Sequence, residues 1–335
     1  MQDRAWSRRA ARPVASCFVQ IRLSVLVLPP YLDLAALGAL LAAALAEDLG
    51  PGGVAAGDVT TRATITAHTQ AEARFIAKED GVVAGLWVAA RVFEAVDMGL
   101  TVAFAVADGA RVAAGEVIGT VAGSARSILV AERLALNLVQ RMSGIATATR
   151  AFVEAVDGTG CRVLDTRKTA PGLRALDKWA VLLGGGANHR VGLYDRLLVK
   201  DNHVDAAGGV RAALDAAVAW RDANAPDLLV ELEVRTLDEI EAALAAGLPR
   251  AGGADILLLD NMARRTPGGA SGGLDVSLLR AAVARVGGRA ETEASGNVTL
   301  GTVRAIAETG VNYVSSGALT HSVRALDVSL KIVLR

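Results

Sequence analysis

The stretch that decides the fold is a short run with an acid at every second position, Val230-Glu231-Leu232-Glu233-Val234. A strand points successive side chains to opposite faces, so both glutamates share one face and the apolar residues share the other. An open parallel sheet is covered by helices on both faces and would bury the two acids, whereas a barrel turns one face inward. The run therefore predicts a barrel strand whose acids point inward near the mouth.

Outward from this run, short apolar segments alternate with stretches that are long enough for helices. A long helix is expected over residues 128–156. After it we expect strands near residues 162–165, 196–199, 228–234, 255–260, 289–293 and 311–315. Alternating strands and helices with right-handed crossovers build a parallel sheet, and the glutamate pattern favours a sheet that is closed into a barrel.

The chain before the long helix predicts a second, smaller domain. A helix is expected over residues 34–46, which is too short to span a bilayer, and strands are expected around residues 71–77, 82–86 and 101–107. Residues 107–118 have the turn spacing of biotinyl and lipoyl domains, but no lysine stands on a neighbouring tight turn to carry the cofactor. The pattern favours a small sandwich domain without a swinging cofactor.

Composition limits the partners of this chain. Its 35 basic and 35 acidic side chains cancel, so no overall field draws it to nucleic acid or to an anionic membrane. Cys17 and Cys161 are too few for a disulfide framework and suit a reducing compartment, which we take to be the cytoplasm. Residues 1–30 mimic a targeting peptide, but Gln20 and Arg22 interrupt the apolar run, so we expect a disordered extension or a misplaced start.

Polar residues stand at the C-terminal end of every expected barrel strand, which is where barrel enzymes place their active sites. They divide by charge into two halves. The cationic half suits a small dicarboxylate, because each guanidinium group can bind one carboxylate through two parallel hydrogen bonds. The anionic half suits ribose hydroxyls or a magnesium ion that also holds substrate phosphates. The cationic members are Arg167, Lys168, His189, Arg190 and Lys200, and the anionic members are Glu231, Glu233, Asp260 and Glu293.

Small residues follow the last two expected strands, in Ser295-Gly296-Asn297 and in Ser316-Gly317-Ala318-Leu319. Such residues expose backbone N–H groups, and barrels hold phosphate after their final strands in this way. Each pair alone also occurs in ordinary turns, but the two together at these positions favour phosphate binding. Arg133 lies on an amphipathic helical stretch, where a solvated arginine is the default interpretation.

Taken together, these motifs closely resemble those of the quinolinate phosphoribosyltransferases, over residues 34–332. The most specific are Asp165-Thr166-Arg167-Lys168-Thr169, Gly184-Gly185-Gly186 before Asn188-His189-Arg190, Lys200-Asp201-Asn202-His203 and Gly317-Ala318-Leu319-Thr320-His321. The resemblance implies an N-terminal α/β sandwich domain joined to an incomplete parallel α/β barrel, assembled as homodimers or hexamers. We expect an unmatched extension at residues 1–30, the sandwich at 31–137, the barrel at 138–321, and a C-terminal helix at 322–335 that packs back on the sandwich.

The resemblance also implies a reaction. The phosphoribosyl group of phosphoribosyl pyrophosphate (PRPP) would pass to quinolinate, with loss of pyrophosphate and carbon dioxide, to give nicotinate mononucleotide for NAD biosynthesis. Magnesium would accompany PRPP, and no organic cofactor would be needed.

Site residues follow from the same resemblance. Quinolinate would be bound by Arg167, His189, Arg190 and Lys200, with Thr166 and Lys168 close by and Arg133 reaching in from the neighbouring subunit. Glu233 and Asp260 would face magnesium and the ribose, and the 5′-phosphate would lie against Ser295, Gly296, Asn297, Gly317, Ala318 and Leu319. The residues expected to carry the catalysis are Lys168, Lys200, Glu233 and Asp260.

Other functions stay open at this point. A molybdenum-transport-associated pyrophosphorylase-like paralogue shares the fold and the phosphate loops but need not use quinolinate. A barrel aldolase would use Lys168 or Lys200 as a Schiff-base nucleophile, and a non-catalytic PRPP sensor would need neither Arg167 nor Arg190. Two local departures from the family pattern are Asp177, at a usually uncharged position, and a glycine-rich stretch at residues 264–273 that predicts an inserted surface loop.

Overall fold

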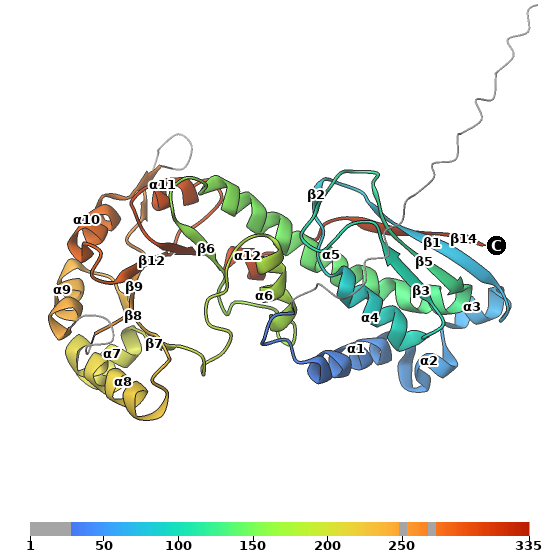
Figure 1. Cartoon of the computed structure of the whole chain (residues 1–335), viewed down its shortest axis with the longest axis horizontal. Coiled ribbons are helices and arrows are strands. Elements are labelled where there is room, and N and C mark those ends of the chain that lie inside the picture. Colours follow the sequence, from blue (N-terminus) through green and yellow to red (C-terminus); the bar gives the residue numbers. More distant parts are fainter. Residues whose placement is uncertain (1–27, 248–252, 267–272, 335) are drawn as a thin grey trace, which may run out of the picture.

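The computed structural model describes residues 28–247, 253–266 and 273–334 (Figure 1). The C-terminal part of the chain is a curved sheet of six strands in the order β6-β13-β12-β9-β8-β7, with neighbours parallel. The strands are β6 (Arg162–Leu164), β7 (Leu197–Val199), β8 (Val230–Val234), β9 (Ile256–Asp260), β12 (Glu291–Ser295) and β13 (Tyr313–Ser315).

The ring of strands stays open between β6 and β7, which lie at the two edges of the sheet. A single parallel bridge, Leu164 to Ala187, extends it beyond β6. Figure 1 shows the six strands of this sheet as an arc with helices on its outer side. This arrangement confirms the incomplete parallel barrel. The helices on this outer side are α7 (Asp201–Ala207), α8 (Val210–Asn224), α9 (Leu237–Ala246), α10 (Ser277–Val286) and α11 (Val303–Ala307), whereas α6 (Arg174–Leu183) and α12 (Ala318–His321) lie beside α5 where the arc meets the sandwich (Figure 1).

Strand β8 is buried on both faces, as the alternating run predicts. Its apolar residues belong to one core cluster with Leu214 of α8 and Ile240 of α9, on the helix side of the sheet. Its two glutamates, Glu231 and Glu233, are also buried, so the opposite face places acids inside the arc. Thr236 and Glu239 form a capping box that ends the strand and begins α9.

The N-terminal part is an α/β sandwich, which confirms the second half of the expected fold. Its antiparallel sheet has the order β14-β1-β5-β3, and the core between sheet and helices is apolar. Phe75 of β1 meets Phe93 of α4 edge to face, with ring centroids 5.9 Å apart. The sheet comprises β1 (Gln70–Ala77), β3 (Thr101–Phe104), β5 (Val117–Ser124) and β14 (Val328–Leu334), and the pair β2 (Gly81–Val82) and β4 (Arg111–Val112) lies beside it. The helical elements are α1 (Leu34–Leu49), η2 (Gly50–Gly52), α2 (Gly53–Ala56), α3 (Val59–Thr64) and α4 (Leu86–Val96).

Helix α5 (Ala125–Ala155) joins the two parts and runs from the sandwich to the start of β6 (Figure 1). Its early buried residues, among them Ile128 and Leu134, belong to the sandwich core, whereas Phe152 near its end belongs to the barrel core. At Gly144 the backbone of Arg324 passes so close that a Cβ atom would clash with its carbonyl oxygen. The glycine therefore lets the returning C-terminal segment cross α5.

The C-terminal helix expected at residues 322–335 is wrong. Residues 328–334 form β14, which pairs with β1 in antiparallel register from Ala71 opposite Leu334 to Ala77 opposite Val328. The segment alternates β-branched and apolar residues with Ser329 and Lys331, which is the period of a strand that buries one face. The C-terminal segment does return to the sandwich, but as a strand at the edge of its sheet.

Two other expectations concern segments that are only partly described. The extension proposed for residues 1–30 lies largely outside the described residues, which begin at Leu28. The loop expected at residues 264–273 is flanked by a short hairpin, β10 (Arg264–Arg265) with β11 (Leu274–Asp275), and its residues 267–272 also lie outside the described residues.

The segment Leu34–Gly52 is long and apolar enough, by length and composition alone, to cross a membrane, and 17% of it is buried. Three of its leucines, Leu37, Leu41 and Leu45, pack into the sandwich core. The core helix of a globular domain passes the same test, as does a signal sequence, so this single helix is weak support for a membrane span.

Candidate active site

Three carboxylates at the mouth, those of Asp201, Glu233 and Asp260, contact two cationic side chains. Lys200, at the end of β7, places Nζ 2.6 Å from Oε2 of Glu233. Arg235 follows β8, and its Nη2 lies 3.1 Å from Oε1 of Glu233 and 2.7 Å from Oδ2 of Asp201, while its Nε lies 3.5 Å from Oδ2 of Asp260. The structure thus brings Lys200, from the cationic half, next to Glu233, and Arg235 connects Glu233 with Asp260.

Arg235 is a residue that the sequence reasoning missed. It stands two positions after Glu233, so the strand period that placed Glu231 and Glu233 on one side would have placed Arg235 beside them. Its three carboxylate neighbours raise the pKa of its guanidinium, first through the hydrogen bond that Arg235 donates to Asp201. The anionic half of the mouth is therefore already partly neutralised by the protein.

The cationic half is centred on two arginines that lie close enough to repel each other. Burial, followed by the charge of Arg167, lowers the pKa of Arg190. Nε of Arg167 is buried and has no hydrogen-bond partner in the described part of the chain. Two neighbouring guanidinium groups are the arrangement that a ligand with more than one carboxylate would satisfy.

A buried ion pair below the mouth carries the loop with His189 and Arg190. Nζ of Lys178 lies 2.5 Å from Oδ1 of Asp165, and both side chains are fully buried. The same lysine donates to the carbonyl oxygen of His189 at 3.0 Å, and Asp165 accepts the backbone N–H of His189 at 2.9 Å. Asn188 donates to the other oxygen of Asp165 at 2.7 Å. Lys178 and Asp165 therefore hold the loop by binding the backbone carbonyl oxygen and the backbone N–H of His189.

His189 has both ring nitrogens occupied by the protein. Nδ1 accepts the backbone N–H of Arg190 at 2.7 Å, and Nε2 lies 3.0 Å from Oε2 of Glu231 and 3.6 Å from Oε2 of Glu293. Arg196 lies 3.0 Å from the same oxygen of Glu231. Burial acts to raise the pKa of Glu231, but the hydrogen bonds from His189 and Arg196 outweigh it, so that its pKa is lowered. The sequence places His189 at the mouth, and the structure turns its ring toward these buried acids.

The departure at Asp177 has a structural reason. Arg141 of α5 binds it through two nitrogens, each 2.8 Å from a carboxylate oxygen, and Asp177 is fully buried. Asp177 also accepts the backbone N–H of Ala170 at 3.1 Å, in the loop that follows Arg167 and Lys168. The acid therefore ties α5 and α6 to a loop of the mouth.

The two small-residue loops lie next to each other and next to Lys168. Oγ of Ser316 donates to the carbonyl oxygen of Val298 at 3.1 Å, which connects them. Gly296 and Asn297 both have positive φ, 87° and 57°. A Cβ atom at Gly317 would lie 2.7 Å from Cδ of Lys168, so this glycine allows the lysine side chain to lie against the loop.

The other predicted site residues are placed as follows. Oγ1 of Thr166 accepts the backbone N–H of Lys168 at 3.1 Å, which shapes the loop after β6. Leu319 is buried in the barrel core, so only its backbone could contact a ligand, and Ala318 begins α12. Arg133 is exposed on α5, between residues that pack into the sandwich core. The single chain therefore does not bring Arg133 into the polar clusters of the mouth.

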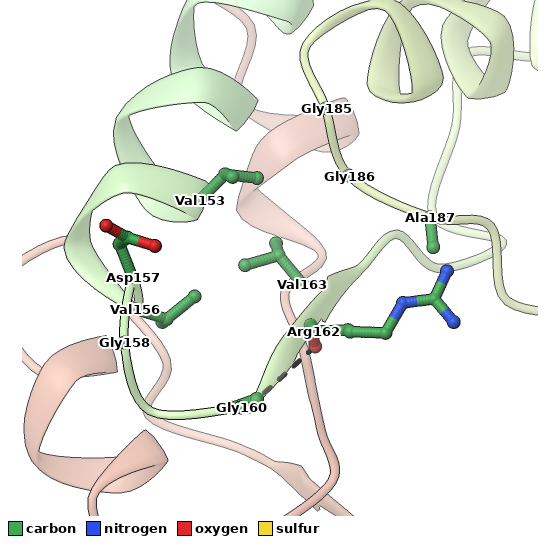
Figure 2. A pocket seen from close by; sticks show the side chains of 11 residues that line it. Val153, Val156, Asp157, Gly158, Gly160, Arg162, Val163, Gly185, Gly186 and Ala187 are labelled. Atoms are coloured by element: carbon green, nitrogen blue, oxygen red, sulfur yellow. Dashed lines mark hydrogen bonds between the residues drawn. The ribbon is translucent and has the colours of Figure 1, made fainter.

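A separate cavity of about 320 Å³ lies at the other end of β6. Figure 2 shows Val153, Asp157 and Arg162 at its wall, with Gly185 and Gly186 above them. Its lining is mostly small and apolar, and it holds none of the predicted site residues. The charged strand ends, and not this cavity, are the candidate active site.

Two family descriptions match the chain. Residues 58–143 match the N-terminal domain of quinolinate phosphoribosyl transferase, and residues 145–331 match its C-terminal domain. A tobacco (Nicotiana tabacum) quinolinate phosphoribosyltransferase (decarboxylating) 1b is 48% identical over 309 residues, which are 92% of this chain and 86% of the relative. A chloroplastic nicotinate-nucleotide pyrophosphorylase (carboxylating) from rice (Oryza sativa subsp. japonica) is 50% identical over 306 residues, which are 91% of this chain and 80% of the relative.

A solved structure agrees with these relatives. The crystal structure of NadC from Streptococcus pyogenes superimposes with a TM-score of 0.79 at 38% identity, over 91% of this chain and 99% of that chain. The names of plant relatives place those proteins in chloroplasts or mitochondria.

Proposed function

Because the chain belongs to the quinolinate phosphoribosyl transferase family, we propose that its barrel mouth transfers the phosphoribosyl group of PRPP to quinolinate, with loss of carbon dioxide. The observation that carries this proposal is the pair Arg167 and Arg190, whose charges oppose each other, together with the buried Nε of Arg167, which has no hydrogen-bond partner in the described part of the chain. A dicarboxylate would relieve the repulsion and accept a hydrogen bond from that donor. Nicotinate, with one carboxylate, would leave the pair under-neutralised.

The remaining cations extend this binding surface. Lys168 and Thr166 lie on the loop that carries Arg167, and Lys200 lies on the neighbouring side of the mouth, paired with Glu233. In this proposal His189 sets the position of Arg190, since both of its ring nitrogens are engaged by the protein. The phosphate of PRPP would lie against the backbone of Gly296, Asn297 and the Gly317-Ala318-Leu319 turn, with Ser295 at the end of β12.

Magnesium fits the donor set at Glu233 and Asp260. The two carboxylates lie on adjacent parallel strands, and Mg²⁺ prefers one or two carboxylates completed by substrate phosphates. When bound with PRPP, the ion would neutralise the pyrophosphate that leaves. Arg235 shares these two carboxylates in the protein alone and would turn toward phosphate when the ion binds.

The bond changes follow from the charges. The pyridine nitrogen of quinolinate attacks C1 of the ribose as the bond from C1 to the pyrophosphate oxygen breaks, through an oxocarbenium-like transition state. The ring nitrogen then carries a positive charge, so the bond from C2 to its carboxylate can break with its electron pair held beside that charge. A proton from water then binds the electron pair that carbon dioxide leaves on C2. Catalysis by this chain would consist of orientation and electrostatic stabilisation, with Lys168, Lys200, Glu233 and Asp260 nearest the reacting groups.

A competing aldolase mechanism would need a neutral lysine at the mouth. Nζ of Lys200 instead lies 2.6 Å from Oε2 of Glu233, so in the protein alone this lysine is engaged in an ion pair. The direct test is to incubate the protein with quinolinate, PRPP and Mg²⁺ and to measure nicotinate mononucleotide and carbon dioxide in equal amounts. Equal turnover of nicotinate, or no turnover of quinolinate, would contradict the proposed function.

Assembly and compartment belong to the same proposal. We place Arg133 in the site of a partner subunit, in a homodimer or a multiple of dimers, because it is exposed in the single chain. We place the protein in the cytoplasm, because Cys161 is a free thiol in the described chain, which suits a reducing compartment. A fluorescent fusion to the C-terminus of the full chain, compared with one that lacks residues 1–30, tests the compartment against the organelles named for plant relatives.

A further inference from the structure

Arg190 is held from two directions through one buried carboxylate, Glu231. Its backbone N–H donates to Nδ1 of His189 at 2.7 Å, and Nε2 of that ring lies 3.0 Å from Oε2 of Glu231. Its guanidinium donates to the carbonyl oxygen of Arg196 at 3.5 Å, and the guanidinium of Arg196 lies 3.0 Å from the same Oε2. One carboxylate oxygen is therefore linked by two series of contacts to the backbone and to the charged end of Arg190.

The direction of these hydrogen bonds determines where the proton of His189 lies. Because Nδ1 accepts the N–H of Arg190, the proton of the neutral ring is on Nε2, which faces Glu231 and Glu293. A divalent cation could use this histidine only if Nε2 also lost its proton, since metal ligands must be deprotonated. That would leave an imidazolate ring, so the arrangement favours a shared proton over a metal ion.

Glu293 is the group that needs such a proton. Its side chain is 0% exposed, and neither of its oxygens has a hydrogen-bond partner among the described residues. Oε1 of Glu231 likewise lacks a donor. A buried carboxylate without a partner takes up a proton rather than remain charged. Burial, followed by the charge of Glu231, raises the pKa of Glu293 well above its usual range. The O–H of a neutral Glu293 can supply the donor that Glu231 lacks.

We propose that Glu231 is a positioning residue for Arg190, and that Glu293 supports it as a neutral carboxylic acid, so that the buried pair carries one negative charge. This inference rests on the proposed quinolinate site, because it concerns how Arg190 is aimed there. The single charge is balanced by Arg196. The titratable and polar groups that face Glu293 are Glu231 on β8, His189, Arg196, Cys161 before β6 and Ser315 on β13.

Kinetics of four variants test the assignment. Glu231→Gln should raise KM for quinolinate by roughly tenfold or more, because it removes a charge-assisted acceptor, and KM for PRPP by less than about twofold. Glu293→Gln can still donate to Glu231 and should raise KM for quinolinate less than about threefold, whereas Glu293→Leu cannot donate and should approach the effect of Glu231→Gln. Glu291→Gln, an exposed glutamate at the start of the same strand, is the matched control.

A second readout does not depend on activity. A carboxyl group whose pKa is higher in the folded protein than in the unfolded chain stabilises the fold at low pH. This stabilisation is lost as pH rises from the pKa of the unfolded state through the pKa of the folded state. The Tm of wild type should therefore fall relative to the Tm of Glu293→Gln as pH rises, because the glutamine side chain does not titrate. The difference in Tm between Glu293→Gln and wild type should grow as pH increases from 5 to 8, whereas Glu291→Gln should follow wild type.

The outcomes separate this inference from the proposed function. If wild type does not convert quinolinate, the proposed function fails, and the positioning role fails with it. If wild type is active but Glu293→Gln is as impaired as Glu293→Leu, or Tm of Glu293→Gln follows wild type with pH, then Glu293 is not a neutral donor. If Glu231→Gln does not fold, Arg196→Gln breaks the second contact of Glu231. An equal rise of both KM values in that variant would overturn the positioning role.

Discussion

Replacement of Lys178 by methionine tests the buried ion pair that carries the substrate loop. The change keeps the volume of the side chain but removes the charge that Asp165 faces at 2.5 Å, and both groups are fully buried. Removing one partner of a buried pair costs about 3–5 kcal/mol of unfolding free energy, because the other charge is left uncompensated. Asp165 keeps donors from Asn188 and from the backbone of His189, so we expect the lower end, about 3 kcal/mol.

The assay is urea unfolding followed by circular dichroism, with the free energy extrapolated linearly to water. Lys331→Met, an exposed lysine on β14, is the matched control and should change stability by less than about 0.5 kcal/mol. The double variant Lys178→Met with Asp165→Asn should recover about 2 kcal/mol, because neither charge then remains. A double variant that is as unstable as the sum of the two single variants would refute the coupling.

The same variant has a pH dependence of known sign. Burial raises the pKa of Asp165, and the attraction of Lys178 opposes that rise. Without Lys178 the pKa of Asp165 rises further, and a raised pKa gives stability that is present at low pH and lost as pH increases. The destabilisation of Lys178→Met should therefore be smaller at pH 5 than at pH 8. A constant difference across this range would show that Asp165 is not the group left uncompensated.

Three further predictions concern the mouth. Arg190→Ala should raise KM for quinolinate far more than KM for PRPP. The fall in kcat/KM for quinolinate should correspond to a loss of roughly 2–5 kcal/mol of transition-state stabilisation, and unchanged steady-state kinetics would mean that Arg190 has only a structural role. Asp260→Asn should weaken Mg²⁺-dependent binding of PRPP in calorimetry and leave quinolinate binding intact; loss of quinolinate binding would contradict the division of the mouth into two halves. Arg133→Ala and Arg167→Ala should each be nearly inactive alone, but a mixture should regain activity as subunits exchange, since some heterodimers place both lesions in one site. If exchange is demonstrated by labelled subunits and activity does not return, Arg133 does not act across the interface.

The barrel could be predicted because its signal is local. The alternation of Glu231 and Glu233 with apolar neighbours depends only on the strand period, and the structure buries both acids on the face opposite the helix-packed core. The C-terminal strand could not be predicted as securely. Ser329 and Lys331 alternate with apolar residues, as in a strand, but a strand also needs an edge to pair with, and that edge is β1, far earlier in the sequence.

The candidate site shows the same limit. The charged strand ends could be found from sequence, because parallel strands bring their C-terminal ends to one face. Lys178 lies in the middle of α6, and the sequence reasoning did not single it out, because its partner Asp165 is known only from the packed structure. Asp177 stood out only as a departure, and its bidentate contact with Arg141 depends on how α5 and α6 pack.

The return of β14 to the sandwich has a consequence for synthesis of the protein. The sheet order places β1 between β14 and β5, so the N-terminal sheet lacks one of its edge strands until residues 328–334 have left the ribosome, after the barrel strands. During that interval β1 presents unpaired N–H and C=O groups, which is the condition under which strands add to other chains. A nascent chain of this protein therefore has an unpaired sheet edge while the barrel is being made, and pairing of β14 with β1 covers that edge.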